Sequence, residues 1–439
     1  MTSDAPRSRE EQALAELGHT SFSRGVRWML VGALLLTILI VPLVQACSEL
    51  GRFRVPSAAA VEAASPEMLE AEVLPFGRDL RRRVRRLLAW VPTEARLRRF
   101  ETALERGSVV GHVVRTTAQT IITSRLDVGN DTIYVGEHRW LFDRMGVEYV
   151  MGPGFLDPQV LARRRAAAKS TDDLQQPDPR PAIIRFRRQL AARGIDLILL
   201  PTPDKAMIHP ERFRSVPRWD SVPQNPSYAA FREALARERV EVFDPSADIY
   251  ARSRTSPAYL RADTHWLPET MGVVAAGLAR TIGRAAGLPP RPQAYRTKEA
   301  EAHLVQFDLV NLLYLPLGQM LYPPLTLRVR QVVDHAGALW QPTPSADVLL
   351  LGDSFCMMYG TDQIGRPLAA GLPETLSVEL ARPLDKICLP GGGAYLSRLV
   401  LANELARGWR RLDGTRVVIW QFAIRDLAWG DWRIVDLPG

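Results

Sequence analysis

Short apolar runs and helical patterns alternate through the second half of the chain. The runs with strand character are Ile195–Leu200, Val240–Phe243, Val348–Leu351, Lys386–Leu389 and Val417–Gln421. Their length and apolar content are typical of parallel strands that are covered on both faces.

Stretches in which apolar residues recur at helical spacing separate these strands. They are a stripe of Ile183, Phe186 and Leu190 that ends at Gly194, and the segments Tyr228–Arg237, Glu269–Ala286, Glu374–Leu380 and Tyr395–Arg407. The stretch Arg291–Pro344 is less regular, and we interpret it as an insert. The alternation predicts an α/β fold, with an open, mainly parallel sheet and helices on both faces.

One long apolar segment, Val26–Ala46, lies near the N-terminus. Apart from Arg27 at its edge it carries no charge, and its length suits the ~30 Å hydrocarbon core of a bilayer. The polar leader before it is longer than that of a cleaved signal peptide, so we expect an uncleaved transmembrane signal anchor. Arginines favour the side before the segment, which predicts residues 1–25 in the cytoplasm and the remainder outside. A lipoprotein cleavage site at Val44–Cys47 is a minor alternative.

The region after the apolar segment differs in composition from the rest of the chain. Residues 47–127 are rich in Ala, Glu and Arg, and helices are predicted at Pro66–Val73, at Asp79–Ala89 and around Ala95–Ile122. We expect this region to be a helical, membrane-proximal spacer. Strand-and-turn character begins at Val128, where we place the start of a domain covering residues 128–439.

Composition and charge narrow the possible functions. Hydrophobic residues make up 46% of the chain and charged residues 24%, as in an ordinary globular protein. The three cysteines and seven histidines lack metal-ligand spacing, so we expect no metal and no other cofactor; one Cys356–Cys388 bridge stays open. The net charge of +8 comes mostly from arginine, and the densest run is Arg78–Arg99. No nucleic-acid-binding motif accompanies that run, which leaves a solvated helix face or contact with anionic lipid or polysaccharide.

A serine follows the apolar run Val348–Leu351 directly after a sharp turn, Gly352-Asp353-Ser354. A serine at a strand-to-helix turn has an exposed hydroxyl and a helix N-terminus beside it, as a nucleophile requires. Taken alone, this turn is as well explained by an ordinary connection. Asp353 is expected to hold the turn rather than to react.

An Asp-x-His pair stands about ninety residues upstream, in the stretch Asp263-Thr264-His265-Trp266. A serine nucleophile needs a base, and the base needs a carboxylate that fixes its tautomer. Asp263 and His265 are two residues apart and fall on the same side of an extended backbone. We therefore predict a triad of Ser354, His265 and Asp263, although a structural role for the histidine is the simpler alternative.

Other candidate residues follow strands and should lie at the same edge of the sheet as Ser354. Gly392 and Gly393, after the strand ending at Leu389, are candidate oxyanion or substrate-binding positions, or part of a flexible loop. Lys205, after the strand ending at Leu200, is a candidate contact for an anionic sugar, or the partner of a carboxylate.

Together these stretches resemble the alginate O-acetyltransferase family, whose catalytic domain is SGNH-hydrolase-like. The residues that carry the resemblance are Gly136–Phe142, Leu200–Lys205, Arg261–Trp266 and Leu351–Phe355, within about residues 128 to 430. In common SGNH esterases the serine comes first and the histidine pair ends the chain. Here the acid and base precede the serine, as in the acetyltransferase branch. The glycine and asparagine blocks of common SGNH enzymes are not recognisable, so the oxyanion donors stay open.

The resemblance implies transfer of acetyl groups to an exported polysaccharide through an acetyl-serine intermediate. It also implies a periplasmic catalytic domain held at the inner membrane, and a membrane-bound O-acyltransferase that delivers the acetyl group. A polysaccharide acetylesterase is an alternative, because the same triad serves hydrolysis. A non-catalytic, carbohydrate-binding scaffold of an export complex is a second alternative.

Overall fold

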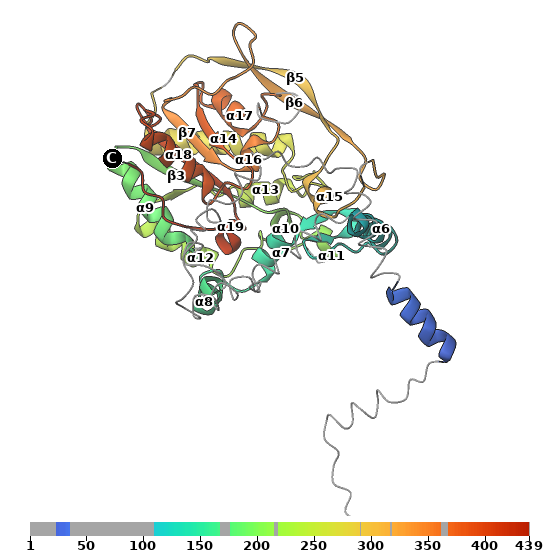
Figure 1. Cartoon of the computed structure of the whole chain (residues 1–439). Coiled ribbons are helices and arrows are strands. Elements are labelled where there is room, and N and C mark those ends of the chain that lie inside the picture. The colour runs from blue at the N-terminus through green and yellow to red at the C-terminus, as the bar shows by residue number, and fades with distance from the viewer. Residues whose placement is uncertain are drawn as a thin grey trace, which may run out of the picture. The chain divides into compact units, whose positions relative to one another are not determined.

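The structure is a computed structural model that describes residues 23–35, 109–166, 176–214, 218–289, 291–316, 318–360 and 368–438. The chain divides into two compact units, Met1–Ala118 and Gln119–Gly439. The second unit contains every strand that the structure describes and all of the candidate site residues (Figure 1).

In the first unit, residues 24–35 are helical, and residues 26–35 of this helix form the beginning of the predicted signal anchor. Residues 36–46, the remainder of that segment, and the predicted helices Pro66–Val73 and Asp79–Ala89 lie outside the described residues. Within the ranges that are described, no helix combines the length and apolar character needed to cross a membrane. The third predicted spacer helix is described from Val109 onward, as α6 (Val109–Leu126).

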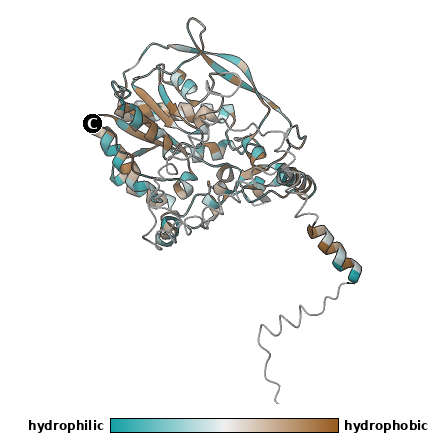
Figure 2. Cartoon of the chain, in the orientation of Figure 1, coloured by the Kyte–Doolittle hydropathy of each residue, from teal (hydrophilic) through white to brown (hydrophobic). Residues whose placement is uncertain are grey.

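A five-stranded sheet forms the centre of the second unit. Its strand order is β4-β3-β9-β7-β8, and each neighbouring pair is parallel. In that order the bounds are Glu241–Val242, Asp196–Thr202, Val417–Ala423, Val348–Gly352 and Asp385–Cys388. The apolar runs correctly predicted all five strands, and the strands of this sheet are largely brown, that is hydrophobic, in Figure 2.

Both faces of the sheet are covered, as the uninterrupted apolar runs predicted. Trp420 on β9 points toward one face, where its ring packs against Phe186 of α9 (Pro179–Ala191). The next residue, Gln421, points to the opposite face and accepts a hydrogen bond from the thiol of Cys356 on α16 (Ser354–Met357). All seven residues of β9 are buried. A strand with both faces covered has no polar alternation, which is why its sequence reads as a continuous hydrophobic run.

The helical segments of the sequence are also confirmed. Predicted helices match α12 (Tyr228–Arg237), α14 (Pro268–Ala286), α17 (Leu372–Glu379) and α18 (Leu396–Ala406). The helices not predicted are short: α7 (Arg144–Met151), α8 (Pro158–Ala166), α10 (Lys205–Ile208), α11 (Glu211–Arg214), α13 (Ser246–Arg252), α15 (Asp308–Leu312), α19 (Asp426–Trp429) and the 3-10 turn η1 (Glu137–Arg139). A small antiparallel pair, β1 (Ile133–Val135) and β2 (Leu141–Asp143), precedes the sheet.

The stretch Arg291–Pro344 is more regular than its sequence suggests. It contains a long antiparallel hairpin of β5 (Tyr295–Leu304) and β6 (Leu325–Asp334), visible outside the sheet in Figure 1. Most residues of β5 are exposed, and many are charged or alanine, which have low strand propensity. Pairing of ten residues on each strand forms the hairpin despite that composition.

The segment between the two hairpin strands packs into a second, smaller core. Its buried members are Ile133, Val135, Leu141, Ala262, Phe307, Leu309, Val310, Leu313 and Tyr322. This core joins β1, β2 and α15 to Ala262, the residue before Asp263. It therefore holds the insert against the loop that carries the predicted acid and base.

Candidate active site

Ser354 begins α16 immediately after β7, and the turn before it is fixed by Asp353. One carboxylate oxygen of Asp353 accepts from the Phe355 N–H at 2.8 Å, and the other accepts from the Ala423 N–H at 2.9 Å. The Asp353 N–H donates to the side chain of Gln421 at 2.9 Å. The bond from Phe355 closes the turn, and the other two tie it to the end of the adjacent strand β9. The predicted role of Asp353 in holding the turn is confirmed.

The glycine of this turn is required by its surroundings. A Cβ atom at Gly352 would lie 2.4 Å from the Cys356 sulfur and 2.8 Å from Gln421 Oε1. Cys356 is buried, and burial raises the pKa of its thiol well above the usual value. Cys356 and Cys388 are both free thiols in the structure, so no bridge joins them here.

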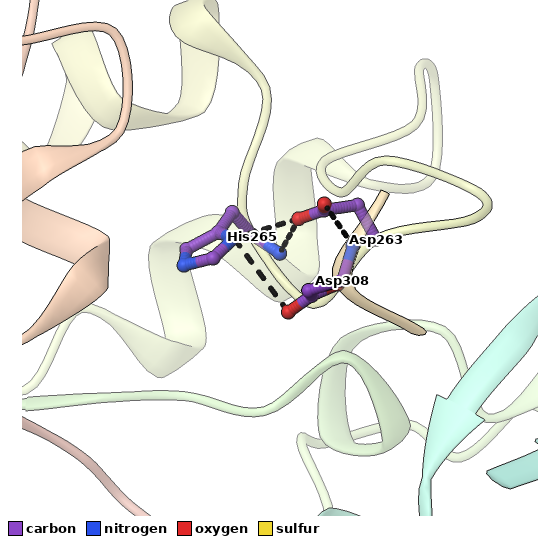
Figure 3. Close-up of side chains that lie close together, drawn as sticks. All are labelled: Asp263, His265 and Asp308. Carbon is purple, nitrogen blue, oxygen red and sulfur yellow. Dashed lines mark hydrogen bonds and ion pairs between the residues drawn. The ribbon is translucent and has the colours of Figure 1, made fainter. Parts of the chain in front are cut away.

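Asp263 and His265 form a buried, hydrogen-bonded pair (Figure 3). His265 Nδ1 lies 2.6 Å from Asp263 Oδ1, and the His265 backbone N–H donates to the same oxygen at 3.0 Å. A carboxylate on Nδ1 favours the tautomer in which Nδ1 carries the proton and Nε2 is free to act as a base. Burial lowers the pKa of His265, but Asp263 and other nearby carboxylates outweigh burial and raise it. Burial raises the pKa of Asp263, and His265 outweighs that effect, holding the pKa below its usual range.

The other ring nitrogen of His265 points away from both carboxylates in Figure 3. This Nε2 atom is buried and makes no hydrogen bond with any residue that the structure describes. The imidazole packs against the ring of Phe355, the residue after Ser354, with centroids 4.9 Å apart. The ring of Trp266 packs against the same phenylalanine ring, with centroids 5.1 Å apart. The loop with the predicted acid and base thus lies against the first turn of the helix that Ser354 begins.

A second carboxylate near His265, that of Asp308, was not among the predicted site residues. Its Oδ2 atom lies 3.9 Å from His265 Nδ1, and its backbone N–H donates to Asp263 Oδ2 at 3.0 Å. Burial and the charge of Asp263 raise the pKa of Asp308 to about 6. The residue lies in the insert, 45 positions after Asp263, where no local pattern marks it.

These three side chains also offer ligand atoms to a cation. One atom each from Asp263, His265 and Asp308 lie within 4.8 Å of one another. A bound metal would displace the 2.6 Å bond between His265 and Asp263, and both carboxylates already accept backbone N–H groups. In this structure the Nδ1 atom of His265 is bonded to Asp263, so the pair orients the imidazole.

Lys205 is buried, so in this conformation it is not exposed to a sugar as the predicted substrate contact requires. Its side chain is buried, and its amine donates to the carbonyl oxygens of Leu141 at 2.8 Å and Arg261 at 3.3 Å. Burial lowers the pKa of Lys205 to about 7. The lysine joins β2 to the loop that precedes Asp263.

The two glycines lie beside the serine turn but differ in their contacts. A Cβ atom at Gly393 would lie 3.0 Å from Asp353 Oδ2 and 2.8 Å from the Cβ of Phe422. The N–H of Gly392 already donates to the Leu389 carbonyl at 2.9 Å. In this conformation Gly392 has no N–H to offer to a substrate, whereas the oxyanion role of Gly393 stays a prediction.

Comparison with known proteins identifies the family. A family model described as "SGNH hydrolase-like domain, acetyltransferase AlgX" matches residues 133–424, more than half of the chain. The chain belongs to this family. The resemblance found in the sequence motifs and the predicted SGNH-like α/β fold are therefore confirmed.

Individual relatives match over shorter stretches. A protein named "Probable alginate O-acetylase AlgJ" from Azotobacter vinelandii is 28% identical over 204 residues, 45% of this chain and 45% of its own length. The protein of the same name from Pseudomonas aeruginosa is 28% identical over 270 residues, 58% and 65% of the two chains. This chain thus spans about half the length of the first of these relatives.

A solved structure shares the fold. The "O-Acetyltransferase Domain of Pseudomonas putida AlgJ" aligns with a TM-score of 0.50 and 22% identity, covering 67% of this chain and 92% of that one. At this identity the likeness bears on the fold alone.

Proposed function

We propose that this protein is an O-acetyltransferase that acetylates an exported polysaccharide through an acetyl-serine intermediate at Ser354. The observation that carries the proposal is the Asp263–His265 pair, whose buried Nε2 makes no hydrogen bond with any described residue. A buried basic nitrogen without a partner is costly unless it serves a function. Its position beside Phe355, next to a serine at a strand-to-helix turn, fits proton transfer from that serine.

In the proposed first half-reaction, His265 Nε2 takes the proton of Ser354 as the hydroxyl oxygen attacks the carbonyl carbon of an acetyl donor. Asp263 stabilises the imidazolium that forms. The negative oxygen of the tetrahedral intermediate is held by the Ser354 N–H together with a donor from the loop at Gly393. The donor's alcohol then leaves with the proton from His265, and the acetyl group remains on Ser354.

In the second half-reaction, His265 takes a proton from a sugar hydroxyl, whose oxygen attacks the acetyl-serine. The new ester bond forms on the sugar as the bond to Ser354 breaks, and His265 returns the proton to the serine oxygen. Water in place of the sugar would yield acetate instead. The positions of the acceptor and of water therefore decide between a transferase and an esterase.

The chain's relatives support the transferase. The matching family is described as an acetyltransferase, and the relatives are named probable alginate O-acetylases. We propose that the acceptor is an exported polysaccharide, alginate-like or of another kind.

The location of the protein in the cell follows from the proposed exported substrate and the apolar segment near the N-terminus. We propose that Val26–Ala46 anchors the chain in the inner membrane with the catalytic domain in the periplasm, and that a membrane-bound O-acyltransferase supplies the acetyl group. Alkaline phosphatase fused after residue 60 in a Gram-negative host should be active. Activity only with a reporter that works in the cytoplasm would overturn this topology.

The test of the function uses the full chain, purified in mild detergent, with an activated acetyl ester and oligosaccharides of exported polymers. A transferase gives acetylated sugar that depends on the acceptor and on Ser354, whereas Ser124→Ala on α6, outside the candidate site, serves as a matched control. Acetate release that no acceptor alters would identify an esterase. Products that persist in Ser354→Ala would overturn Ser354 as the nucleophile, and a folded parent that forms neither product would leave the non-catalytic scaffold.

A further inference from the structure

Asp308 is bonded reciprocally to the loop that carries the acid and base. Its backbone N–H donates to Asp263 Oδ2 at 3.0 Å, and its own Oδ1 atom accepts from the Thr264 N–H at 2.8 Å. One residue of the insert therefore fixes the carboxylate of Asp263 and the backbone beside it. Asp263 can rotate only by breaking the bond to Asp308 as well as those to His265.

The second oxygen of Asp308 is directed at the imidazole. Asp308 Oδ2 lies 3.9 Å from His265 Nδ1, and the Asp308 side chain is 37% exposed while that of His265 is 9% exposed (Figure 3). This distance exceeds a hydrogen bond but is short enough for a strong charge interaction at a partly buried site. Asp308 thus acts on the ring electrostatically, whereas Asp263 also bonds to it.

Other charged groups near the imidazole come from different elements. Asp263 faces it from its own loop, Asp308 from α15, and Asp353 from the turn before α16. Lys205 on α10 lies close enough to Asp263 and Asp308 to interact with both charges. Removal of one carboxylate therefore leaves two others, and the effect should be graded rather than complete.

The position of Asp308 is set by the second core rather than by the loop itself. Phe307 and Leu309, on either side of it, are both buried in that core, together with Ala262. The Leu141 N–H donates to the carbonyl of Arg261 at 2.9 Å, which ties β2 to the same loop. Since both partners are anchored in one packed cluster, the distance between Asp308 and His265 is held without a direct bond.

We infer that Asp308 is a positioning residue that fixes the Asp263 carboxylate and supplies a second negative charge to the imidazolium of His265. The inference rests on the proposed acyl transfer, because only there does His265 become charged in each half-reaction. Asp308 would act through His265 and touch neither acetyl donor nor acceptor.

Asp308→Asn is the sharpest test, because asparagine can keep the bond to the Thr264 N–H and remove only the charge. Asp334→Asn, at the end of β6 in the same insert, is the matched control. We expect kcat for an activated acetyl ester to fall on the order of tenfold with KM unchanged, as for loss of a partly screened charge at this distance. The control should stay within about twofold of the parent, because Asp334 lies outside the group of charges around His265.

The pH dependence separates a charge effect from a merely structural one. Without the Asp308 charge the imidazolium is less favoured, so the pKa of His265 should fall by about one unit. The acid limb of kcat/KM should move to lower pH by the same amount. NMR titration of His265, assigned by comparison with His265→Gln, measures this pKa whether or not the protein turns over substrate.

The outcomes distinguish this inference from the proposed function. An unchanged His265 pKa and unchanged kcat in Asp308→Asn would overturn the inference while leaving the function intact. An equal loss of rate at every pH, with a lower Tm and no pKa shift, would reduce Asp308 to a structural residue and also overturn it. If the His265 pKa falls as expected in Asp308→Asn but the parent never forms acetyl-serine, the proposed function is overturned instead.

Discussion

Replacing Asp263 by asparagine should nearly abolish acyl transfer while leaving the fold in place. A charged pair at the 2.6 Å separation of Nδ1 and Oδ1 is worth about 6 kcal/mol at an effective dielectric constant of about 20. At about 1.4 kcal/mol for each tenfold change in rate, this corresponds to a loss of about 10⁴ in kcat. The same substitution in the serine-protease triad has an effect of about this size.

The hydrogen bonds of Asp263 add a second consequence. Asp263 Oδ1 accepts from the His265 N–H as well as from the ring, and Oδ2 accepts from the Asp308 N–H. An amide has only one acceptor oxygen, so in either orientation the substituted side chain sets its NH₂ group against a backbone N–H. We expect a stability loss of about 1–3 kcal/mol, the usual cost of an unpaired buried polar group.

The assay is the steady-state release of acetate from an activated acetyl ester, with denaturant unfolding as the measure of stability. Asp436→Asn removes a carboxylate from an exposed ion pair with Arg185 and is the control, since such pairs contribute little. A well-folded Asp263→Asn protein that keeps more than a tenth of the parent kcat would refute the reasoning. Asp263 would then belong to a structural turn.

Two further predictions concern residues that surround the site. Gly393→Ala should lower kcat on the order of 10²-fold, because the new methyl group would displace Phe422 or the Asp353 carboxylate that holds the serine turn. The control is Gly283→Ala, which has open space around its Cβ and should leave kcat unchanged. Equal activity of the two variants would contradict this prediction. The pKa of Lys205 falls from 10.5 to about 7 on folding, so between these values the unfolded state binds more protons. The free energy of unfolding of the parent, measured by urea denaturation relative to that of Lys205→Met, should therefore rise from about pH 7 to about pH 10. If the difference between the two proteins is constant or falls with pH, the buried amine stays charged.

Much of the fold could be predicted because the sheet is buried on both faces. Its strands have short apolar runs, and the helices between them have a period that local sequence reveals. The hairpin of β5 and β6 could not be predicted in the same way. Most of β5 is exposed, and both strands are held by pairing between residues up to 39 positions apart, Tyr295 and Asp334 being the most distant pair.

The candidate site was predictable only where its residues lie in local motifs. Ser354 follows an apolar strand and a glycine turn, and Asp263 and His265 are two positions apart, so each pattern is visible in a short stretch. Asp308 enters the site through the packing of a distant insert, and nothing in its neighbourhood in the sequence shows this. The burial of Lys205 could not be predicted, because lysine is seldom buried. Its partners are carbonyl groups from two remote segments.

The most direct test of the account is the location of the acetyl group during turnover. The full chain is mixed with an activated acetyl ester, quenched with acid, digested and examined by mass spectrometry for a ~42 Da adduct, as expected for a covalent intermediate. We predict that the adduct maps to Ser354, is absent from Ser354→Ala, and decays faster when an oligosaccharide acceptor is added. An adduct on another residue, or none on Ser354 while the folded parent still acetylates sugar, would contradict the central claim.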